Sequence, residues 1–200
     1  GSCPYQAPTD MGVNMAGNCI TDDGACREAA CQEIVRRYYD VLSDRRQGRG
    51  GDDPVYKLEL LMQQAGITPA IRPVVDQANR LEEETGEPAM AIQLPDGRMV
   101  TGKTSELMGC SAAALLQTVK VQYLGSNNPR LHSDEVLIAL AASANLDPKA
   151  ARALEALAHL QGCQAHCSVI LSPADEGTYR KLGIQLTCEP KYQTNKLYHR

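Results

Sequence analysis

The strongest constraint on the fold is a strand, a helix and a second strand that follow one another closely near the end of the chain. Residues 167–171 are rich in β-branched side chains and predict a strand, and residues 184–187 predict another. Between them, Ser172 begins a capping-box-like pattern and Gly183 ends the predicted helix. Because such crossovers usually join parallel neighbours in one sheet, the pattern predicts an α/β protein.

The rest of the chain alternates helical patterns with one predicted hairpin. Two strands flank a turn with the sequence Pro95-Asp96-Gly97, which favours a hairpin. Residues 47–54 are rich in glycine and end in proline, which predicts a flexible linker. The periodicity predicts helices over residues 25–43, 55–65, 73–84 and 105–121, strands over 89–94 and 98–101, and later helices beginning at Ser133 and Pro148.

These elements predict two regions. Residues 1–66 form an irregular lead-in and a helical segment, and residues 67–200 form an α/β domain. We expect the domain to be a mixed sheet between helical layers.

The amino-acid composition indicates which classes of partner and which cellular location to expect. The net charge of -4 provides no broad basic field, so we expect no nucleic-acid partner. No apolar run reaches the ~18 residues of a membrane span, and no signal peptide opens the chain. Most of the eight cysteines lie in apolar patterns, which indicates reduced core thiols. We therefore expect a soluble cytoplasmic protein that is a homo-oligomer and contacts no membrane.

Residues 97–104 match the phosphate-binding loop G-x-x-x-x-G-K-[ST] literally. In that loop Gly102 and Lys103 would approach phosphates, and Thr104 would hold magnesium. The turn signal at Gly97 favours a returning strand instead. Even in a hairpin, residues 102–105, including Ser105, could bind an anion as the cap of the next helix.

A second candidate site lies at a predicted junction between a loop and a helix. It combines Arg130, His132, Asp134 and Glu135, so His132 could act as a general base beside the two carboxylates. The sequence favours a plainly capped helix start here. We nevertheless assign catalytic candidacy to His132, Asp134 and Glu135, and ligand binding to Arg130.

Two weaker patterns complete the candidates. Cys163, His166 and Cys167 could form a thiol with its base, but a zinc site would need a second close pair of ligands, which is not evident. We therefore predict no metal site, and no particular cofactor is indicated. Asp10 and Asn14 lie in a polar, glycine-rich stretch that could line a pocket, although a structural loop is favoured.

Three long motifs resemble one large bacterial family that is catalogued only as a domain of unknown function. They are residues 8–14 (PTDMGVN), 128–140 (NPRLHSDEVLIAL) and 181–190 (KLGIQLTCEP). The resemblance runs from Tyr5 to His199 and is to the C-terminal half of the family. It implies a further N-terminal half as a partner, and relatives with more residues between Leu116 and Tyr123. Some members are labelled ATP-dependent peptidases, but this chain has no H-E-x-x-H motif.

The order helix, hairpin, helix, strand, helix, strand is also similar to the cytidine-deaminase-like fold, which implies a three-layer α/β architecture. That fold takes zinc ligands from a His-x-Glu helix and a Pro-Cys-x-x-Cys motif. Residues 105–112 contain no histidine, and no Pro-Cys-x-x-Cys follows. We therefore expect at most the fold and not the deaminase chemistry.

Two functions remain open. The domain could bind a small anionic or phosphorylated ligand, as an enzyme or a binding module. Alternatively, it could be a structural or oligomerisation domain that supports a catalytic N-terminal half. Whether the chain is an enzyme is not decided by its sequence.

Overall fold

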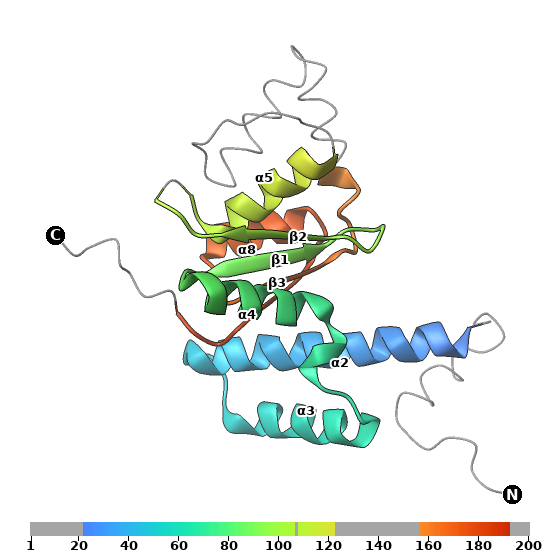
Figure 1. Cartoon of the computed structure of the whole chain (residues 1–200). Helices are drawn as coiled ribbons and strands as arrows, with labels where there is room; N and C mark the ends of the chain where they lie inside the picture. The colour runs from blue at the N-terminus through green and yellow to red at the C-terminus, as the bar shows by residue number, and fades with distance from the viewer. Residues whose placement is uncertain (1–21, 107, 123–156, 193–200) are drawn as a thin grey trace, which may run out of the picture. The chain divides into compact units, whose positions relative to one another are not determined.

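The computed structural model describes residues 22–106, 108–122 and 157–192 (Figure 1). The chain divides into two compact units, residues 1–72 and residues 73–200, and each is described by itself. Among the described residues, no helix combines the length and the apolar character that crossing a membrane requires.

The first unit contains a pair of helices. Helix α2 spans Asp23–Arg46, and α3 spans Asp52–Ala65 and is followed by the short 3-10 helix η2, Pro69–Ile71. The side chain of Asp22 caps α2 by accepting a hydrogen bond from the amide of Ala25 at 2.8 Å. Gly66 ends α3 in the left-handed conformation, as its position in the sequence predicted. The buried side chains of the pair are Val35, Tyr39 and Leu42 on α2 and Val55 and Met62 on α3.

The predicted linker, residues 47–54, is shorter than expected at its C-terminal end. Residues 47–51 do connect the helices, but α3 begins at Asp52, so Pro54 lies in its first turn. Proline is tolerated there because the first amides of a helix have no partner within the helix. The two aspartates before Pro54 also suit the positive end of the helix.

The second unit is a four-stranded mixed sheet between helices, which confirms the α/β prediction (Figure 1). The strand order is β2-β1-β3-β4, in which β1 runs antiparallel to β2 and β3, while β3 and β4 are parallel. The crossover through α8 therefore joins a parallel pair, as expected. The elements are α4 (Pro73–Thr85), β1 (Ala89–Gln93), β2 (Met99–Lys103), α5 (Cys110–Gln122), β3 (Gln164–Cys167), α8 (Pro173–Lys181) and β4 (Gln185–Cys188).

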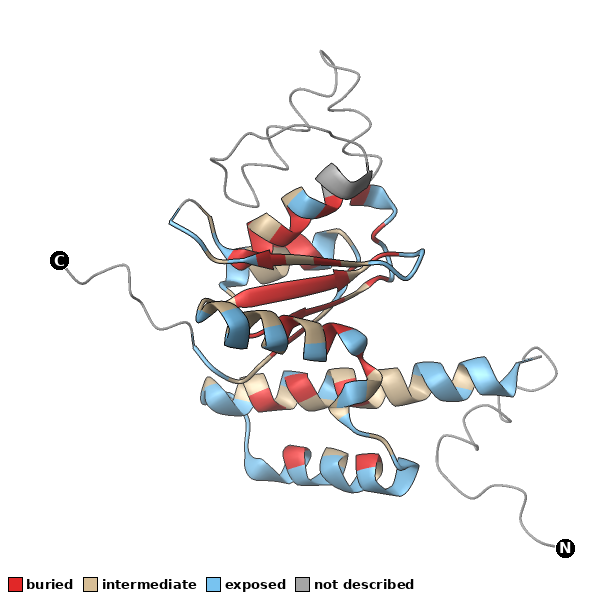
Figure 2. Cartoon of the chain, viewed as in Figure 1, coloured by how far each residue is buried: buried red, intermediate tan, exposed pale blue. Residues whose placement is uncertain are grey.

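Helices cover both faces of the sheet. Helix α4 packs on one face, where Val74 and Ala78 meet Ala91. Helices α5 and α8 cover the other face, over a core that includes Met90 and Ile92. Figure 2 shows β1 buried along its length, as expected for a central strand between two helical layers.

Two boundaries differ from prediction for physical reasons. Helix α5 begins at Cys110 rather than Ser105, because the amide of Ser105 turns back to the carbonyl of Met108 at 2.9 Å. Strand β3 covers residues 164–167, whereas residues 167–171 were predicted. Val169 and Ile170 are buried in the connection to α8, so their apolar character reflects burial rather than strand pairing.

Candidate functional site

Cys110 lies where the carboxyl ends of three strands meet the start of a helix. It opens α5, and its amide donates to the hydroxyl of Thr104, just after β2, at 3.2 Å. Its sulfur is 3.6 Å from the sulfur of Cys167, the last residue of β3. Cys188, the last residue of β4, is the register partner of Cys167. Ligands of open α/β sheets usually bind at this carboxyl edge.

The surroundings of Cys110 favour negative charge on its sulfur, although the residue is only 3% exposed. A hydrogen bond from Cys167 is the main cause that lowers the pKa of Cys110, and the hydroxyl of Thr104 and the amide of Ser111 lower it further. Burial and the charge of Asp175 oppose this shift. Burial raises the pKa of Cys167 well above its usual value, so Cys110 is the thiol that ionises first.

The first turns of α5 and α8 are joined at the same edge. Asp175 accepts hydrogen bonds from the hydroxyls of Ser111 at 2.9 Å and Ser172 at 2.7 Å. Ser172 also caps α8 by accepting from the amide of Asp175. The hydroxyl of Tyr179, which is fully buried, donates to the carbonyl of Ser111 at 2.9 Å. These bonds fix the helix start that carries Cys110.

A polar cluster lies on the opposite face of the sheet, towards α4. Nδ1 of the fully buried His166 is 2.8 Å from the hydroxyl of Thr187. Because that hydroxyl donates to the carbonyl of Ala165 at 3.2 Å, it accepts from Nδ1, which therefore carries a proton. Nε2 lies 3.3 Å from Oε1 of Glu189, and that oxygen accepts a hydrogen bond from the side-chain amide of Asn79 in α4 at 2.9 Å. The cluster links β3 and β4 to α4, and the burial of His166 marks it as structural.

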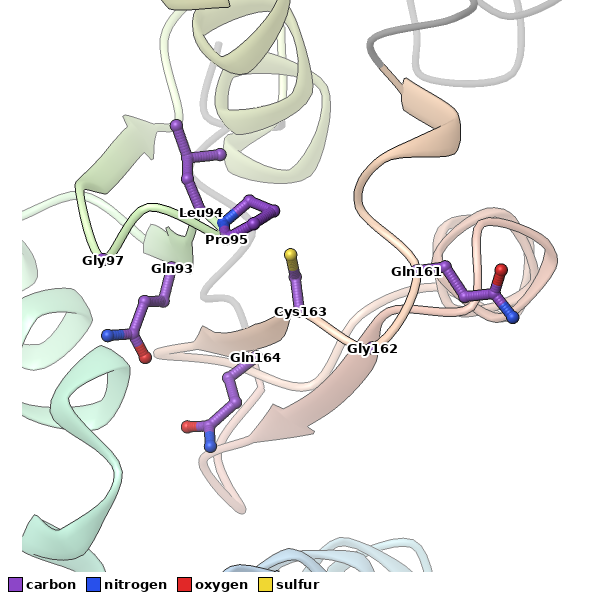
Figure 3. A pocket seen from close by; sticks show the side chains of 8 residues that line it. All are labelled: Gln93, Leu94, Pro95, Gly97, Gln161, Gly162, Cys163 and Gln164. Atoms are coloured by element: carbon purple, nitrogen blue, oxygen red, sulfur yellow. The ribbon is translucent and has the colours of Figure 1, made fainter.

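A pocket of about 400 Å³ opens at the other end of the strands (Figure 3). It lies between the hairpin turn and the start of β3, and the sulfur of Cys163 is directed toward Leu94 and Pro95. Burial raises the pKa of Cys163. No side chain that lines the pocket carries a formal charge, so the pocket offers shape and amide groups rather than acid–base chemistry. Its lining residues are Gln93, Leu94, Pro95, Gly97, Gln161, Gly162, Cys163 and Gln164.

The phosphate-loop match is a hairpin, as the turn signal favoured. Gly97 turns with a φ of 84°, and residues 99–103 return as β2 against β1. Gly102 lies against α5, where an added Cβ would be 2.3 Å from the amide nitrogen of Ala114. A glycine is therefore required at this position so that β2 can pack against α5, and Gly102 does not wrap a phosphate.

The structure places four of the predicted ligand-binding residues together, at the end of β2. Lys103 is exposed, whereas the amide of Thr104 donates to the carbonyl of Pro88 and that of Ser105 to the carbonyl of Met108. Those two amides are therefore occupied within the protein. The other candidates lie outside the described residues: Asp10, Asn14, Arg130, His132, Asp134 and Glu135.

The predicted thiol–base group does not assemble. Cys163 lines the pocket, while His166 lies on the α4 face and Cys167 contacts Cys110 on the other face. Strand alternation explains the separation, because His166 and Cys167 are neighbours in β3 and point to opposite faces. Among the described residues, no group of three potential ligands could hold a metal ion. Sequence reasoning missed the pairing of Cys110 with Cys167, since 57 residues separate them.

Two family models match the chain. The model described as domain of unknown function DUF1846, C-terminal, matches residues 70–122 and 116–198. The model described as domain of unknown function DUF1846, N-terminal, matches residues 1–66. The helical segment within residues 1–66 therefore corresponds to part of the N-terminal domain of the family.

Curated relatives carry only a family name. The chain is 50% identical to the UPF0371 protein CE2832 of Corynebacterium efficiens, 49% to a UPF0371 protein of Corynebacterium glutamicum and 48% to one of Streptococcus pneumoniae. Each alignment runs over 224 residues and covers all of this chain but 45% of the relative, so the chain spans less than half the length of these relatives.

The C-terminal model matches this chain in two separate parts that overlap at residues 116–122, and the alignment with the relatives needs 224 positions for 200 residues. Both findings support the expectation that relatives carry more residues after Leu116. The sequence motifs, both family models and these identities agree: the chain belongs to the DUF1846 (UPF0371) family, whose two domain models are described as domains of unknown function.

Proposed function

We propose that the α/β unit binds a small anionic ligand at the edge formed by the end of β2 and the first turns of α5 and α8. The observation that carries the proposal is the state of Cys110: hydrogen-bond donors lower its pKa even though the thiol is buried. An environment that stabilises a thiolate would also stabilise the negative charge of a ligand. Phosphate is the chemical class that best fits a helix start beside a lysine.

Lys103 is the group through which the ligand would be attracted. It is exposed at the end of β2 and precedes Thr104, whose hydroxyl bonds the α5 amide. Because Gly102 faces α5, the Lys103 side chain leaves the strand on the opposite face and would reach the ligand around the edge of the sheet. Asp175 already accepts hydrogen bonds at the start of α8, and its negative charge disfavours an anion there. The ligand is therefore expected away from Asp175, at the edge of the sheet where β2 ends.

A thermal-shift titration tests this proposal. Inorganic phosphate and ATP with Mg²⁺ are added to the wild type, to Lys103→Ala and to Lys181→Ala, whose lysine is exposed at the other end of α8. Phosphate is expected to raise the Tm of the wild type and of Lys181→Ala, and to raise that of Lys103→Ala less. Equal stabilisation of the three proteins, or none, would contradict anion binding at this edge.

We further propose that the α/β unit has the cytidine-deaminase-like fold, with its helices and strands in the same order. The observed succession of α4, the β1–β2 hairpin, α5, β3, α8 and β4 supports it. In that fold zinc ligands come from the starts of the corresponding helices. Here α5 begins with Cys110 and α8 with Pro173-Ala174, so the ligand set is incomplete and no deaminase step is proposed.

The state of the thiols supports a cytoplasmic location. None of the six described cysteines is joined in a disulfide, and two of them have sulfur atoms 3.6 Å apart. Disulfides form and persist in oxidising compartments, while the cytosol keeps thiols reduced. We therefore propose that the protein works in a reducing compartment.

The second candidate is a supporting role within a longer protein. Tyr56 and Leu60, one turn apart on α3, are 62% and 37% exposed. Both lie in the region that matches the N-terminal family model, while the relatives extend well beyond the aligned part. We propose that this α3 face packs against the rest of the N-terminal domain in a full-length relative. The competing partner for this face is a second copy of the chain, which would make a homo-oligomer.

A further inference from the structure

We propose that Cys110 and Cys167 form a redox pair that closes reversibly to a disulfide when the protein meets a two-electron oxidant of the peroxide class. The two sulfur atoms are 3.6 Å apart although their residues are 57 positions apart in the chain. A disulfide bond is about 2.05 Å long, so the sulfurs must approach by roughly a further 1.5 Å. The inference concerns the oxidation of two thiols and does not require the anion site to be occupied.

The two thiols are prepared for different parts of the reaction. Hydrogen bonds lower the pKa of Cys110, so this sulfur reaches the nucleophilic thiolate form more readily. Burial raises the pKa of Cys167, which keeps its proton and donates it toward Cys110. A thiolate beside a protonated thiol is the usual arrangement of an attacking and a resolving cysteine.

The chemistry balances in two steps. The thiolate of Cys110 attacks one oxygen of hydrogen peroxide, the O–O bond breaks, and the departing hydroxide takes a proton to become water. This leaves a sulfenic acid on Cys110. The sulfur of Cys167 then attacks the sulfur of Cys110, the S–O bond breaks, and the hydroxide leaves with the proton of Cys167 as a second water. Two electrons pass from the thiols to the peroxide, and a dithiol reductant reverses the change.

Neighbouring thiols supply matched controls. Cys163 lies in the same unit and is 8% exposed against 3% for Cys110, so easier access cannot explain a faster loss of Cys110; burial raises the pKa of Cys163, and its sulfur is 3.9 Å from the carbonyl of His159. Cys188 is the register partner of Cys167 and is the competing resolving thiol. Cys26 and Cys31 on α2 are more exposed and report general oxidation.

Peptide mapping of the folded full chain tests the pair. The protein is treated with hydrogen peroxide, quenched with acid, alkylated and digested with trypsin. Cys110 then lies in peptide 104–120, Cys167 in peptide 153–180 together with Cys163, and Cys188 in peptide 182–191. A linked species of peptides 104–120 and 153–180, two hydrogens lighter than their sum and separated again by dithiothreitol, is expected.

Variants assign the linkage to individual sulfurs. The linked species should persist in Cys163→Ser and disappear in Cys110→Ser and Cys167→Ser. In the wild type, free Cys110 should be lost at least about tenfold faster than free Cys163, because the thiolate is the reacting form. Where a variant fails to fold, fragmentation of the wild-type linked species between residues 163 and 167 shows which of the two cysteines of peptide 153–180 carries the link.

Three results would overturn the proposal. They are no intramolecular link under oxidation, a dominant link of peptide 104–120 to peptide 182–191, or a link that Cys163→Ser abolishes. An equal phosphate-induced Tm shift in the wild type and Lys103→Ala, or none in either, together with an intact Cys110–Cys167 link would contradict the anion site and leave the redox pair standing.

Discussion

Gly102 is a residue at which the backbones of β2 and α5 approach each other closely. A Cβ at this position would lie 2.3 Å from the amide nitrogen of Ala114, and within 2.8 Å of two other backbone atoms of α5. Backbone atoms cannot rotate away as a side chain can, so the whole helix would have to move. The glycine that completes the phosphate-loop pattern is therefore explained by packing.

Replacing Gly102 by alanine is expected to lower the free energy of unfolding by about 2 kcal/mol or more, in the range of overpacked cores. The matched control is Gly177→Ala in α8, where an added Cβ meets no atom within 4 Å. There the substitution should raise stability by about 0.5–1 kcal/mol, because alanine is the better helix former. Urea unfolding of both variants measures the difference, and an equally small effect at the two sites would show that α5 is not held against β2.

At the residue scale, the sequence predicted turns better than contacts. The Asp96-Gly97 signal correctly indicated a hairpin, because turn chemistry depends on adjacent residues. The contact of Cys110 with Cys167 was not predictable in this way, because it depends on where α5 and β3 meet in the sheet. The role of His166 in linking strands and a helix likewise depends on Glu189 and Asn79, which lie far from it in the sequence.

At the scale of the element, α2 carries a connected group of ion pairs on its surface. Arg36 contacts Glu33 at 2.7 Å and Asp40 at 2.6 Å, and Arg37 contacts Glu33 at 2.8 Å. The hydrogen bond from Arg36 is the main cause that lowers the pKa of Glu33 to about 2. Pairs three or four residues apart lie on one helix face and stabilise it modestly.

The pH dependence of this group has a definite sign. Because the pKa of Glu33 is lower in the folded state, its stabilisation is present above about pH 4.5 and is lost as the pH falls toward 2. Glu33→Gln should therefore lower stability at pH 7 by roughly 0.5 kcal/mol, since both partners are partly exposed, and this difference should shrink steadily as the pH falls from about 4.5 through about 2. Denaturant unfolding across this range measures it. A difference that is as large at pH 2 as at pH 7, or that does not shrink in 1 M salt, would exclude the ion pair as its cause.

Elements with strong local signals were predicted well. Helix α4 was expected over residues 73–84 and spans Pro73–Thr85, because proline at its start and spaced apolar residues mark it locally. Helix α5 was expected to begin at Ser105 but begins five residues later, at Cys110. Its true start is set by the hydroxyl of Thr104 and the turn between Ser105 and Met108, which apolar periodicity does not report.

At the scale of the whole molecule, the chain contains two units that correspond to two family models. The N-terminal model ends its match at residue 66 and the C-terminal model begins at residue 70. The relatives are more than twice as long as the aligned part, since that part is 45% of their length. Partners of the N-terminal unit are therefore expected in the remainder of those proteins.

The α3 face provides the test at this scale. Tyr56→Ala with Leu60→Ala should lower the stability of a full-length relative by roughly 2 kcal/mol or more, the amount expected when buried apolar side chains are truncated. The same change in the 200-residue chain should cost little, because both side chains are exposed there. Size-exclusion chromatography of the chain serves as the control for self-association. Equal losses in both proteins, or a dimer that the double variant dissociates, would contradict docking of the N-terminal domain.

The central claim is that the start of α5 stabilises negative charge at Cys110. The direct measurement is a pH titration of thiolate absorbance at 240 nm, taken as the difference between the wild type and Cys110→Ser, with Thr104→Ala as a second variant. The account predicts that Cys110 ionises below the usual range of a cysteine, because Cys167, Thr104 and Ser111 donate to its sulfur, and that Thr104→Ala moves the midpoint upward. A midpoint at or above the ordinary value in the wild type would contradict it.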